Sequence, residues 1–502
     1  MEEHDTSSSD PLKQSLPPET LDPSDVIRLR QEAENVDNTI RALQTQLLQL
    51  EARRSAIQDR LSAVIYPVNT LPAEVLCHTF QALVASSIPI EVNSALLSIT
   101  AVCQRWRSVA IADPHLWTTL CYILRAPIRD YRDPLFYCFL ERTQGLPIVV
   151  HIDERGTSQC SLPSVLFDSS HQWTEAYLTD ADAESDGTTF RTFRLGSLDT
   201  VLNLPYLTTL TLNVDMSAGH DHSRTFGNAP HLRELTISHL PLVSLLGFPV
   251  HQLRKLTLLR STSSGDTLYL LPRLVALEEL TLDSLFHNQR GDQQPIELPL
   301  LTTLSLLGDE SCGITRFLIL PRLTTLRLST FDEYDGNILV PDCLRRSSAN
   351  LASLSLKHAY YTDFAILLQS PIVSTALKSL TVTSLKATHR EAMALATLLS
   401  RADFLPSLEK LTFVASGSPP YLLLSFLRGL HRRVAHWQSL SGSAQHATNL
   451  KLRSFRVQLP EGVSMEDMRQ LHRLQQTLHS YQSARGSTVT DRLPQHFDHK
   501  YM

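Results

Sequence analysis

Apolar residues recur at alternating steps of three and four along residues 26–64. This heptad spacing predicts one long helix that carries a single apolar stripe. The stripe consists of Val26, Leu29, Ala33, Val36, Ile40, Leu43, Leu47, Leu50, Ile57, Leu61 and Val64, and Arg54 interrupts it. An isolated helix cannot bury such a stripe. We therefore expect residues 25–66 to form a coiled-coil helix, which pairs either with another chain or with a later part of its own chain.

Two further segments with helical spacing follow the proline that ends this helix, Pro67. The stretch "LPAEVLCHTF" at 71–80 predicts a helix that begins after Pro72, and "NSALLSITAVCQRWRSVAI" at 93–111 predicts a second helix. Their apolar positions are Val75, Leu76, Phe80, Leu96, Ile99, Val102, Cys103 and Trp106. The stretch "DPHLWTTL" at 113–120 predicts a turn and a strand. A unit of about fifty residues buries little core, so we expect it to share its apolar faces with a partner.

A leucine repeat of the form L-x-x-L-x-L occupies most of the remaining chain. Clear examples start at residues 207, 232, 253, 277, 301, 323, 351 and 377, so successive starts are 21 to 28 residues apart. Further examples start at 190 and 408, and 452 begins a candidate late member. This period is typical of leucine-rich repeats, in which each turn of a solenoid contributes one short strand. Most units lack the Asn or Cys that usually follows the last leucine, so we expect an irregular α/β solenoid.

The alternation within each repeat predicts which side chains point out of the sheet. The last two leucines are two residues apart and face the core, so the residue between them faces outward. These outward positions are Thr211, Thr236, Thr257, Thr281, Ser305, Arg327, Ser355, Thr381 and Thr412. Neighbouring outward positions carry charges of both signs, at Glu234, Lys255, Glu279, Asp283, Lys357 and Lys410. Threonine suits an exposed strand without any ligand, but the lone central charge makes Arg327 a candidate substrate contact for an acidic or phosphorylated group.

Local signals complete the expected domain organisation. Residues 133–145 predict a helix capped by Asp133 and ended by Gly145, and Thr388 with Glu391 forms a capping box before an apolar helix at 388–400. Further helices are expected at 421–434 and 464–484. The predicted order is a disordered tail (1–24), the coiled-coil helix (25–66), an all-α unit (67–120), a linking helix with the first strands (121–189), the solenoid (190–460), and a C-terminal helix with a polar tail (461–502).

Composition narrows the classes of partner. The 502 residues include 42% apolar and 19% charged residues, and the formal net charge is −6, so neither a nucleic acid nor an anionic membrane surface is an expected partner. The seven cysteines are scattered without a CxxC pair, and no secretory signal or run of 18 apolar residues occurs. We expect reduced thiols and an intracellular protein, cytoplasmic or nuclear.

Motifs for catalysis or metal binding are weak. The chain has no glycine-rich phosphate loop, no G-x-S-x-G and no H-E-x-x-H. A calcium-loop pattern starts at Asp182, but Phe193 stands where a bidentate Glu belongs. The pairs His220/His222 and His496/His499 lack further ligands at metal spacing. We therefore expect no enzyme activity, no metal and no cofactor.

Residues 71–120 resemble the F-box. The shared anchors are the initial Leu-Pro-x-Glu-Val-Leu, the Val-Cys-x-x-Trp helix and the final Pro-x-Leu-Trp, whereas Thr79 replaces the usual Ile and the first connection is longer. Together with the heptad helix and the repeats, the chain looks like the large F-box families of mushroom-forming fungi. The resemblance implies docking on the Skp-type adaptor of a Skp–cullin–F-box ubiquitin ligase. The implied adaptor contacts are Leu71, Pro72, Val75, Leu76, Phe80, Ile99, Val102, Cys103, Leu116 and Trp117, while Trp106 either contacts the adaptor or only holds the helices together.

The resemblance implies a substrate-recognition subunit that binds the adaptor through the F-box and an unknown protein substrate through the repeats. The heptad helix adds a possible homo-oligomer. The alternative is a protein-interaction scaffold of the same architecture that is not associated with a ligase.

Overall fold

The structure, a computed structural model, describes residues 22–62, 70–125, 133–155, 168–180, 202–213, 226–238, 245, 247–261, 264–284, 294–308, 311–331, 336–401, 403–414, 420–440, 454–458, 469 and 476. The chain divides into two compact units, Met1–Leu76 and Cys77–Met502. The predicted calcium loop, both histidine pairs, the repeat at 190 and almost all of the helix at 464–484 lie outside the described residues.

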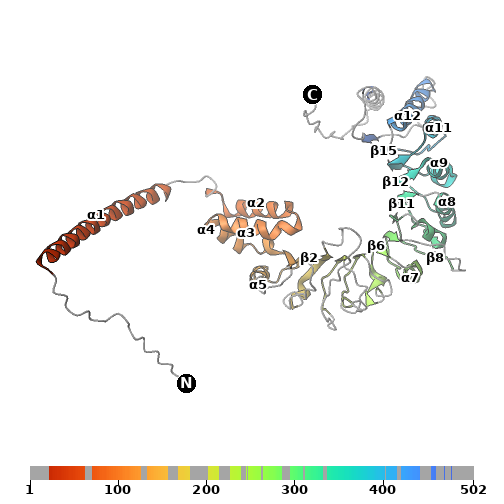
Figure 1. The fold of residues 1–502 in the computed structure, drawn as a ribbon. Helices are drawn as coiled ribbons and strands as arrows, with labels where there is room; N and C mark the ends of the chain where they lie inside the picture. Colours follow the sequence, from red (N-terminus) through yellow and green to blue (C-terminus); the bar gives the residue numbers. More distant parts are fainter. Residues whose placement is uncertain are drawn as a thin grey trace. The chain divides into compact units, whose positions relative to one another are not determined.

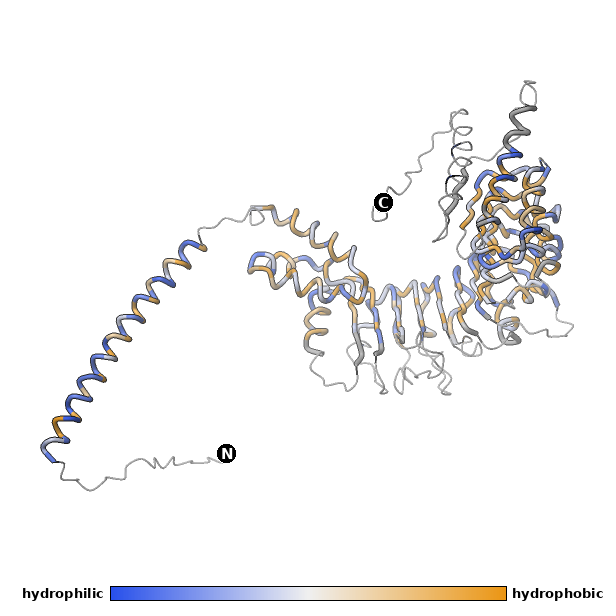
Figure 2. The backbone as a smooth tube through the Cα atoms, turned by 45° about the horizontal axis from the view of Figure 1, so that its top comes forward, coloured by the Kyte–Doolittle hydropathy of each residue, from blue (hydrophilic) through white to orange (hydrophobic). Residues whose placement is uncertain are grey.

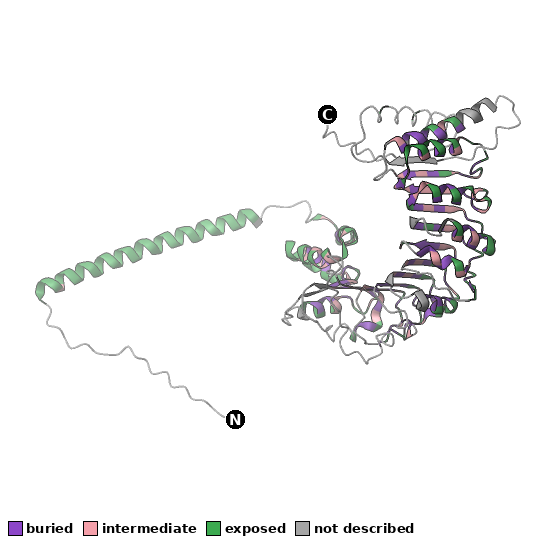
Figure 3. Cartoon of the chain, turned by 45° about the vertical axis from the view of Figure 1, so that its right-hand side comes forward, coloured by how far each residue is buried: buried purple, intermediate pink, exposed green. Residues whose placement is uncertain are grey.

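The first unit contains the long helix predicted from the heptads. Helix α1 runs over Pro23–Ser62, 40 residues, and begins with a proline, which suits the first turn of a helix. Its stripe is exposed: Leu43 retains 59% and Leu50 64% of their accessible surface. Figure 3 shows exposure along the whole helix. The helix is therefore confirmed, while its pairing in a coiled coil stays a prediction.

Short helices follow in the region of the F-box resemblance. They are α2 (Ala73–Ser86), η2 (Pro89–Glu91), α3 (Val92–Val102), α4 (Gln104–Ala112) and η3 (Pro114–Trp117). The single helix expected over 93–111 is wrong, because Cys103 is extended with φ −158° and ψ 169°. The Cys103 Sγ accepts a hydrogen bond from the Trp106 N–H at 3.4 Å and so caps the new helix. Helical periodicity continues across this break, which is why the sequence pattern did not reveal it.

Fourteen strands in the described residues form one parallel sheet whose order follows the chain. They are β1 (Thr119–Arg125), β2 (Ile148–Arg155), β3 (Trp173–Asp180), β4 (Thr209–Asn213), β5 (Glu234–Ser238), β6 (Lys255–Ser261), β7 (Glu279–Ser284), β9 (Thr303–Leu306), β11 (Thr325–Phe331), β12 (Ser353–Tyr360), β13 (Ser379–Thr383), β14 (Leu385–Lys386), β15 (Lys410–Val414) and β16 (Ser454–Gln458). Strand β14 pairs with β12 beside β13. Strands β8 (Ile296–Glu297) and β10 (Leu318–Ile319) pair separately. The arrangement is consistent with a leucine-rich-repeat-like α/β architecture.

The register confirms that the predicted outward positions form one row, although Ser305 of that row is buried, with 5% of its surface exposed. Thr211 pairs with Thr236, and the pairing continues through every predicted position from Thr257 to Thr412. The flanking leucines of each strand are almost fully buried. The row also extends backwards to Tyr177 and His151, which precede the recognisable repeats.

Helices and short 3-10 segments connect the strands. They are α5 (Asp133–Arg142), α7 (Ser264–Leu270), α8 (Gly336–Ser347), α9 (Tyr361–Gln369), α10 (Pro371–Ser374), α11 (His389–Ser400) and α12 (Pro420–Leu440), with the 3-10 segments η5 (Ser170–Gln172), η9 (Val250–Gln252), η10 (Leu271–Arg273) and η11 (Ser311–Phe317). Figure 1 shows α8, α9 and α11 on the same side of β11, β12 and β15. The helices expected at 133–145, 388–400 and 421–434 are confirmed.

Two predicted helix ends are also present. The capping box at Thr388 and Glu391 is complete, because the Thr388 side chain accepts from the Glu391 N–H and the Glu391 carboxylate accepts from the Thr388 N–H. Gly145 adopts a φ of 79° after α5, the left-handed conformation that ends a helix. Local sequence therefore set both of these boundaries.

Candidate functional site

Aromatic packing holds the helices of the F-box-like region together. The rings of Phe80 on α2 and Trp106 on α4 lie 4.9 Å apart at 55°. Phe80 is 1% exposed, and the Trp106 indole N–H is buried without a hydrogen-bond partner in the described part of the chain. Trp106 therefore fastens α4 to α2, which is one of the two roles that the sequence left open.

Trp117 connects this region to the rest of the second unit. The side chain is fully buried, and its Nε1 donates to the Ala110 carbonyl at 2.9 Å. Its ring packs on Phe139 of α5 at 5.0 Å, and the Arg142 guanidinium lies 4.4 Å above it. Because one residue contacts both α4 and α5, the helices and the first strands form a continuous core.

The helices of the F-box-like region cover the edge of the sheet at β1. Strand β1 is the last strand at its end of the sheet, and an uncovered edge invites pairing with other chains. The Asn93 side chain of α3 donates to the Cys121 carbonyl and accepts from the Cys121 N–H. These are the hydrogen bonds that a neighbouring strand would make, so Asn93 replaces a strand at this position.

The structure divides the predicted adaptor contacts by burial. Five side chains are at most 2% exposed, and a partner cannot contact them while the fold persists: Leu76, Phe80, Ile99, Leu116 and Trp117. Pro72 is exposed, Val75 is 43% exposed and Val102 is 58% exposed. Leu71, Cys103 and Trp106 are partly buried. Adaptor contact stays a prediction, and it applies best to the exposed residues.

Exposed apolar residues that the sequence did not single out lie on the same helices. Leu83 on α2 is 48% exposed, Leu97 on α3 is 43% exposed and Ile111 on α4 is 37% exposed, while Ile88 beside η2 is 56% exposed. Helical spacing marked the apolar positions but did not say which of them face solvent. These residues give the region an apolar surface beyond its own core, which is typical of an interaction site.

The spacing of His, Cys, Asp and Glu side chains in the described residues bears on metal binding. No group of three His, Cys, Asp or Glu side chains is close enough together to hold a metal ion within these ranges. A hollow of about 310 Å³ between α2, η2 and η3 is lined mainly by small and apolar residues, with His115 its one titratable group. None of the described helices is long and apolar enough to span a membrane, and the six described cysteines are free thiols.

A second candidate surface is the outward face of the sheet. At its start, the His151 and Tyr177 rings stack at 4.5 Å and 6°, and the Tyr177 hydroxyl donates to the Glu175 carboxylate at 2.7 Å. Burial, this hydrogen bond and the charges of Glu175 and Glu234 raise the pKa of Tyr177 to about 12. Burial lowers the pKa of His151, and Glu175 opposes that shift. The phenol therefore stays a hydrogen-bond donor beside a neutral imidazole.

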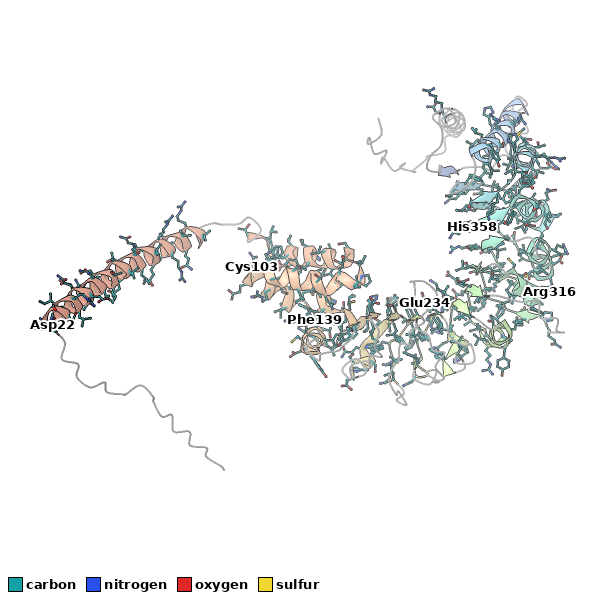
Figure 4. All side chains as sticks on the ribbon, viewed as in Figure 1. Asp22, Cys103, Phe139, Glu234, Arg316 and His358 are labelled. Atoms are coloured by element: carbon teal, nitrogen blue, oxygen red, sulfur yellow. The ribbon has the colours of Figure 1, made fainter. Side chains whose placement is uncertain are left out.

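Charges on this outward face are divided between its two ends. Among the side chains that the structure describes, strands β2 to β7 carry the acidic residues Asp153, Glu175, Glu234, Glu279 and Asp283 on this face, with one lysine, Lys255, that pairs with Glu234 at 3.5 Å. Strands β11 to β15 carry the exposed cations Arg327, Lys357, Lys386 and Lys410, and no described residue of those strands is acidic. Figure 4 labels one residue of each stretch, Glu234 on β5 and His358 on β12. We call β11–β15 the basic stretch.

The cations of the basic stretch are largely uncompensated. Arg327, Lys357 and Lys410 have no ion pair among the described residues, while Lys386 lies 5.0 Å from the centre of the Tyr360 ring. Arg327 and Lys410 are three strand steps apart, about 14 Å at the usual spacing. Ser355, Thr381 and Thr412 lie in the central row beside them and offer hydroxyl donors. The stretch suits an extended segment with several negative groups.

Comparison with known proteins supports the assignment of the F-box-like region. A family model described as F-box-like matches residues 68–123. The chain therefore contains an F-box-like domain, a class that generally binds Skp-type adaptors and serves in protein interaction. The match extends into β1, so the domain contributes the first strand of the sheet.

Comparisons over the whole chain add little. A search of curated proteins found no match. One similar solved structure is a protein from Bacteroides fragilis, with 18% sequence identity and a TM-score of 0.29. The similarity covers 37% of this chain and 59% of that protein, so the chain spans less than two thirds of its length.

Proposed function

We propose that the chain is the substrate-recognition subunit of a Skp–cullin–F-box ubiquitin ligase. The observation that carries this proposal is the F-box-like domain at 68–123, whose helices keep apolar side chains such as Val102 and Leu97 exposed. The protein acts without catalysis of its own, by holding a substrate near a ligase and so raising its effective concentration there. An intracellular location and the mushroom-fungus type of F-box protein belong to the same proposal.

The repeat region supplies the substrate site in this proposal. We interpret its parallel strands as a degenerate leucine-rich-repeat-like solenoid whose outward face binds a protein. The basic stretch favours an acidic or phosphorylated segment, because the planar guanidinium of Arg327 belongs to a row of residues with hydroxyl groups. The acidic end of the same face opposes a long polyanion, which argues against nucleic acid.

The adaptor interaction is tested with an exposed residue, so that loss of binding is separable from unfolding. Val102→Asp places a charge on a side chain that is 58% exposed, and it should weaken binding to a purified Skp-type adaptor about tenfold or more while the circular dichroism spectrum is unchanged. Ile366→Asp is the matched control, since Ile366 on α9 is 50% exposed and lies in the repeats. Equal adaptor binding by the parent, Val102→Asp and Ile366→Asp at micromolar concentration contradicts the proposed docking surface.

The alternative function is an interaction scaffold without a ligase. The ligase subunit and the scaffold differ in whether cullin joins the complex of the chain with the adaptor. Co-elution of the chain with both the adaptor and cullin supports the ligase subunit, whereas a complex with the adaptor alone, in the presence of cullin, supports the scaffold.

A further inference from the structure

Helix α1 keeps an apolar stripe exposed along its whole length. Eight apolar residues of its heptad stripe are 46–64% exposed: Leu29, Val36, Ile40, Leu43, Leu47, Leu50, Ile57 and Leu61. The helix has 40 residues, about 60 Å at the usual rise. Burying a stripe of this length in a two-helix interface is strongly favourable, because each large aliphatic side chain contributes to it. Figure 2 shows the apolar positions recurring along the tube of this helix.

The charges beside the stripe are not distributed at random. In heptad notation Val26, Ala33, Ile40, Leu47, Arg54 and Leu61 occupy position a, and the residue before each occupies position g. The g flank reads Asp25, Glu32, Thr39, Gln46, Arg53 and Arg60, so it is acidic in its first half and basic in its second. None of its four charged residues forms a salt bridge with another described residue.

This flank is complementary to itself in only one orientation. In antiparallel two-helix pairs the g flanks of the two helices lie side by side, whereas in parallel pairs each g flank faces an e flank. Antiparallel pairing sets the acidic half of each g flank along the basic half of the other. The e flank, Arg30, Asp37, Gln44, Glu51 and Gln58, also lies along its own copy in an antiparallel pair, and there Asp37 meets Glu51, a like-charge pair that offsets part of the gain on the g flank. Parallel pairing brings Glu32 against Asp37, which offsets its one favourable pair of Asp25 with Arg30.

The interruption of the stripe favours the same orientation. Arg54 occupies position a, and in a parallel in-register pair it would meet Arg54 of the second copy inside the seam. With full antiparallel overlap the layers join Leu29 to Leu61, Ala33 to Ile57, Val36 to Arg54, Ile40 to Leu50 and Leu43 to Leu47. Arg54 then lies against Val36, where its aliphatic part packs and its guanidinium reaches solvent. We propose that α1 pairs with α1 of a second copy of this chain in an antiparallel coiled coil, from which the two chains leave at opposite ends.

The test uses two charge-reversed versions of the full chain. Asp25→Lys with Glu32→Lys makes the g flank entirely basic, and Arg53→Glu with Arg60→Glu makes it entirely acidic. Each variant alone should dimerise about tenfold or more weakly than the parent, because unlike pairs become like pairs. Mixing the two variants should restore a dimer, since each flank now complements the other. Sedimentation equilibrium measures both, and differently tagged chains show that the restored dimer is mixed.

Other outcomes overturn the proposal. In a parallel pair, Asp25→Lys with Glu32→Lys relieves the repulsion between Glu32 and Asp37. If this double variant self-associates as strongly as the parent, the pair is parallel. A monomeric parent at micromolar concentration shows that the stripe is covered by its own chain or by a different protein. Circular dichroism checks that each variant keeps its helix content. Adaptor binding by every variant is the control for the second unit, and its result is independent of the dimer.

Discussion

At the scale of single residues, the outward row of the sheet changes character along its length. It begins with a stacked pair, His151 and Tyr177, continues through threonines, and reaches its first cation at Arg327. Burial and the acidic neighbours raise the pKa of Tyr177, while burial lowers the pKa of His151. The two ends of the outward row therefore differ in charge and in hydrogen-bonding capacity, although both consist of parallel strands.

Arg327 should matter for the substrate and not for the adaptor. Arg327→Ala removes the one cation that the central row has within β11–β15, since the next one, Arg456, lies on β16 beside Thr412, and we expect weaker capture of an acidic substrate with unchanged adaptor binding. Arg322→Ala, at an exposed position before β11, is the matched control. Pull-down of substrate by the chain measures both. A substrate that the variant holds as tightly as the parent would place recognition elsewhere on the chain.

His151 should contribute to acid sensitivity. Its pKa in the folded protein is lowered below the ordinary value near 6.5, so the unfolded chain binds a proton that the folded imidazole does not. Its contribution to stability is therefore lost as the pH falls below about 6.5. His151→Gln should show a smaller decrease in urea midpoint between pH 7.5 and 5.5 than the parent. The same substitution at exposed His358 serves as the control, and identical pH profiles for parent and His151→Gln would refute this account.

At the scale of elements, close packing of α11 against α12 depends on a glycine. A Cβ on Gly429 of α12 would lie 2.6 Å from the Ala396 carbonyl oxygen and 2.8 Å from its Cα. Both atoms belong to the backbone of α11, so neither can rotate away. Glycine normally weakens a helix interior, and here the close approach of the two helices explains its presence.

Gly429→Ala should therefore destabilise the protein in spite of the higher helix propensity of alanine. Overpacking of this kind costs about 1–3 kcal/mol. Urea denaturation followed by circular dichroism measures the change, with Arg432→Ala, an exposed position on α12, expected within about 0.5 kcal/mol of the parent. A stabilised Gly429→Ala protein would mean that α11 and α12 do not approach this closely.

At the scale of the whole chain, the helices of the F-box-like region and the parallel sheet follow each other without a linker in the second unit. The F-box-like match ends in β1, and β1 pairs in parallel with β2 along seven residues. Trp117 and Asn93 fix the helices to this end of the sheet. The strands beyond it pair only with their neighbours in the sheet order, so disturbance at one end should stay local.

Trp117→Ala should reveal this coupling. The substitution empties a fully buried site and should cost about 3–5 kcal/mol in the adjoining core. We expect faster amide hydrogen exchange in α4, β1 and β2 and unchanged exchange in β13 and β15. Phe413→Ala, equally buried at the other end, should show the reverse distribution. Uniformly faster exchange across the sheet in both variants would show one cooperative unit instead.

The sequence alone determined the features that depend on local spacing. The heptads predicted α1, the leucine period predicted the strands, and alternation predicted the outward row from Thr211 to Thr412. The capping box at Thr388 was equally visible. Each of these follows from the geometry of a helix or strand, which repeats every few residues whatever the rest of the chain does.

Only the tertiary structure decided which apolar residues are buried and which are exposed. Leu76 and Trp117 are core, whereas Val102 is exposed, although all three resemble anchors of one motif. The apolar periodicity continues through Cys103, but the helix ends there. The backbone of Cys103 is extended, and its sulfur caps α4. His151 and Tyr177 join the outward row through strands that lack the repeat. Burial and pairing depend on contacts between segments distant in sequence, and no local pattern specifies those contacts.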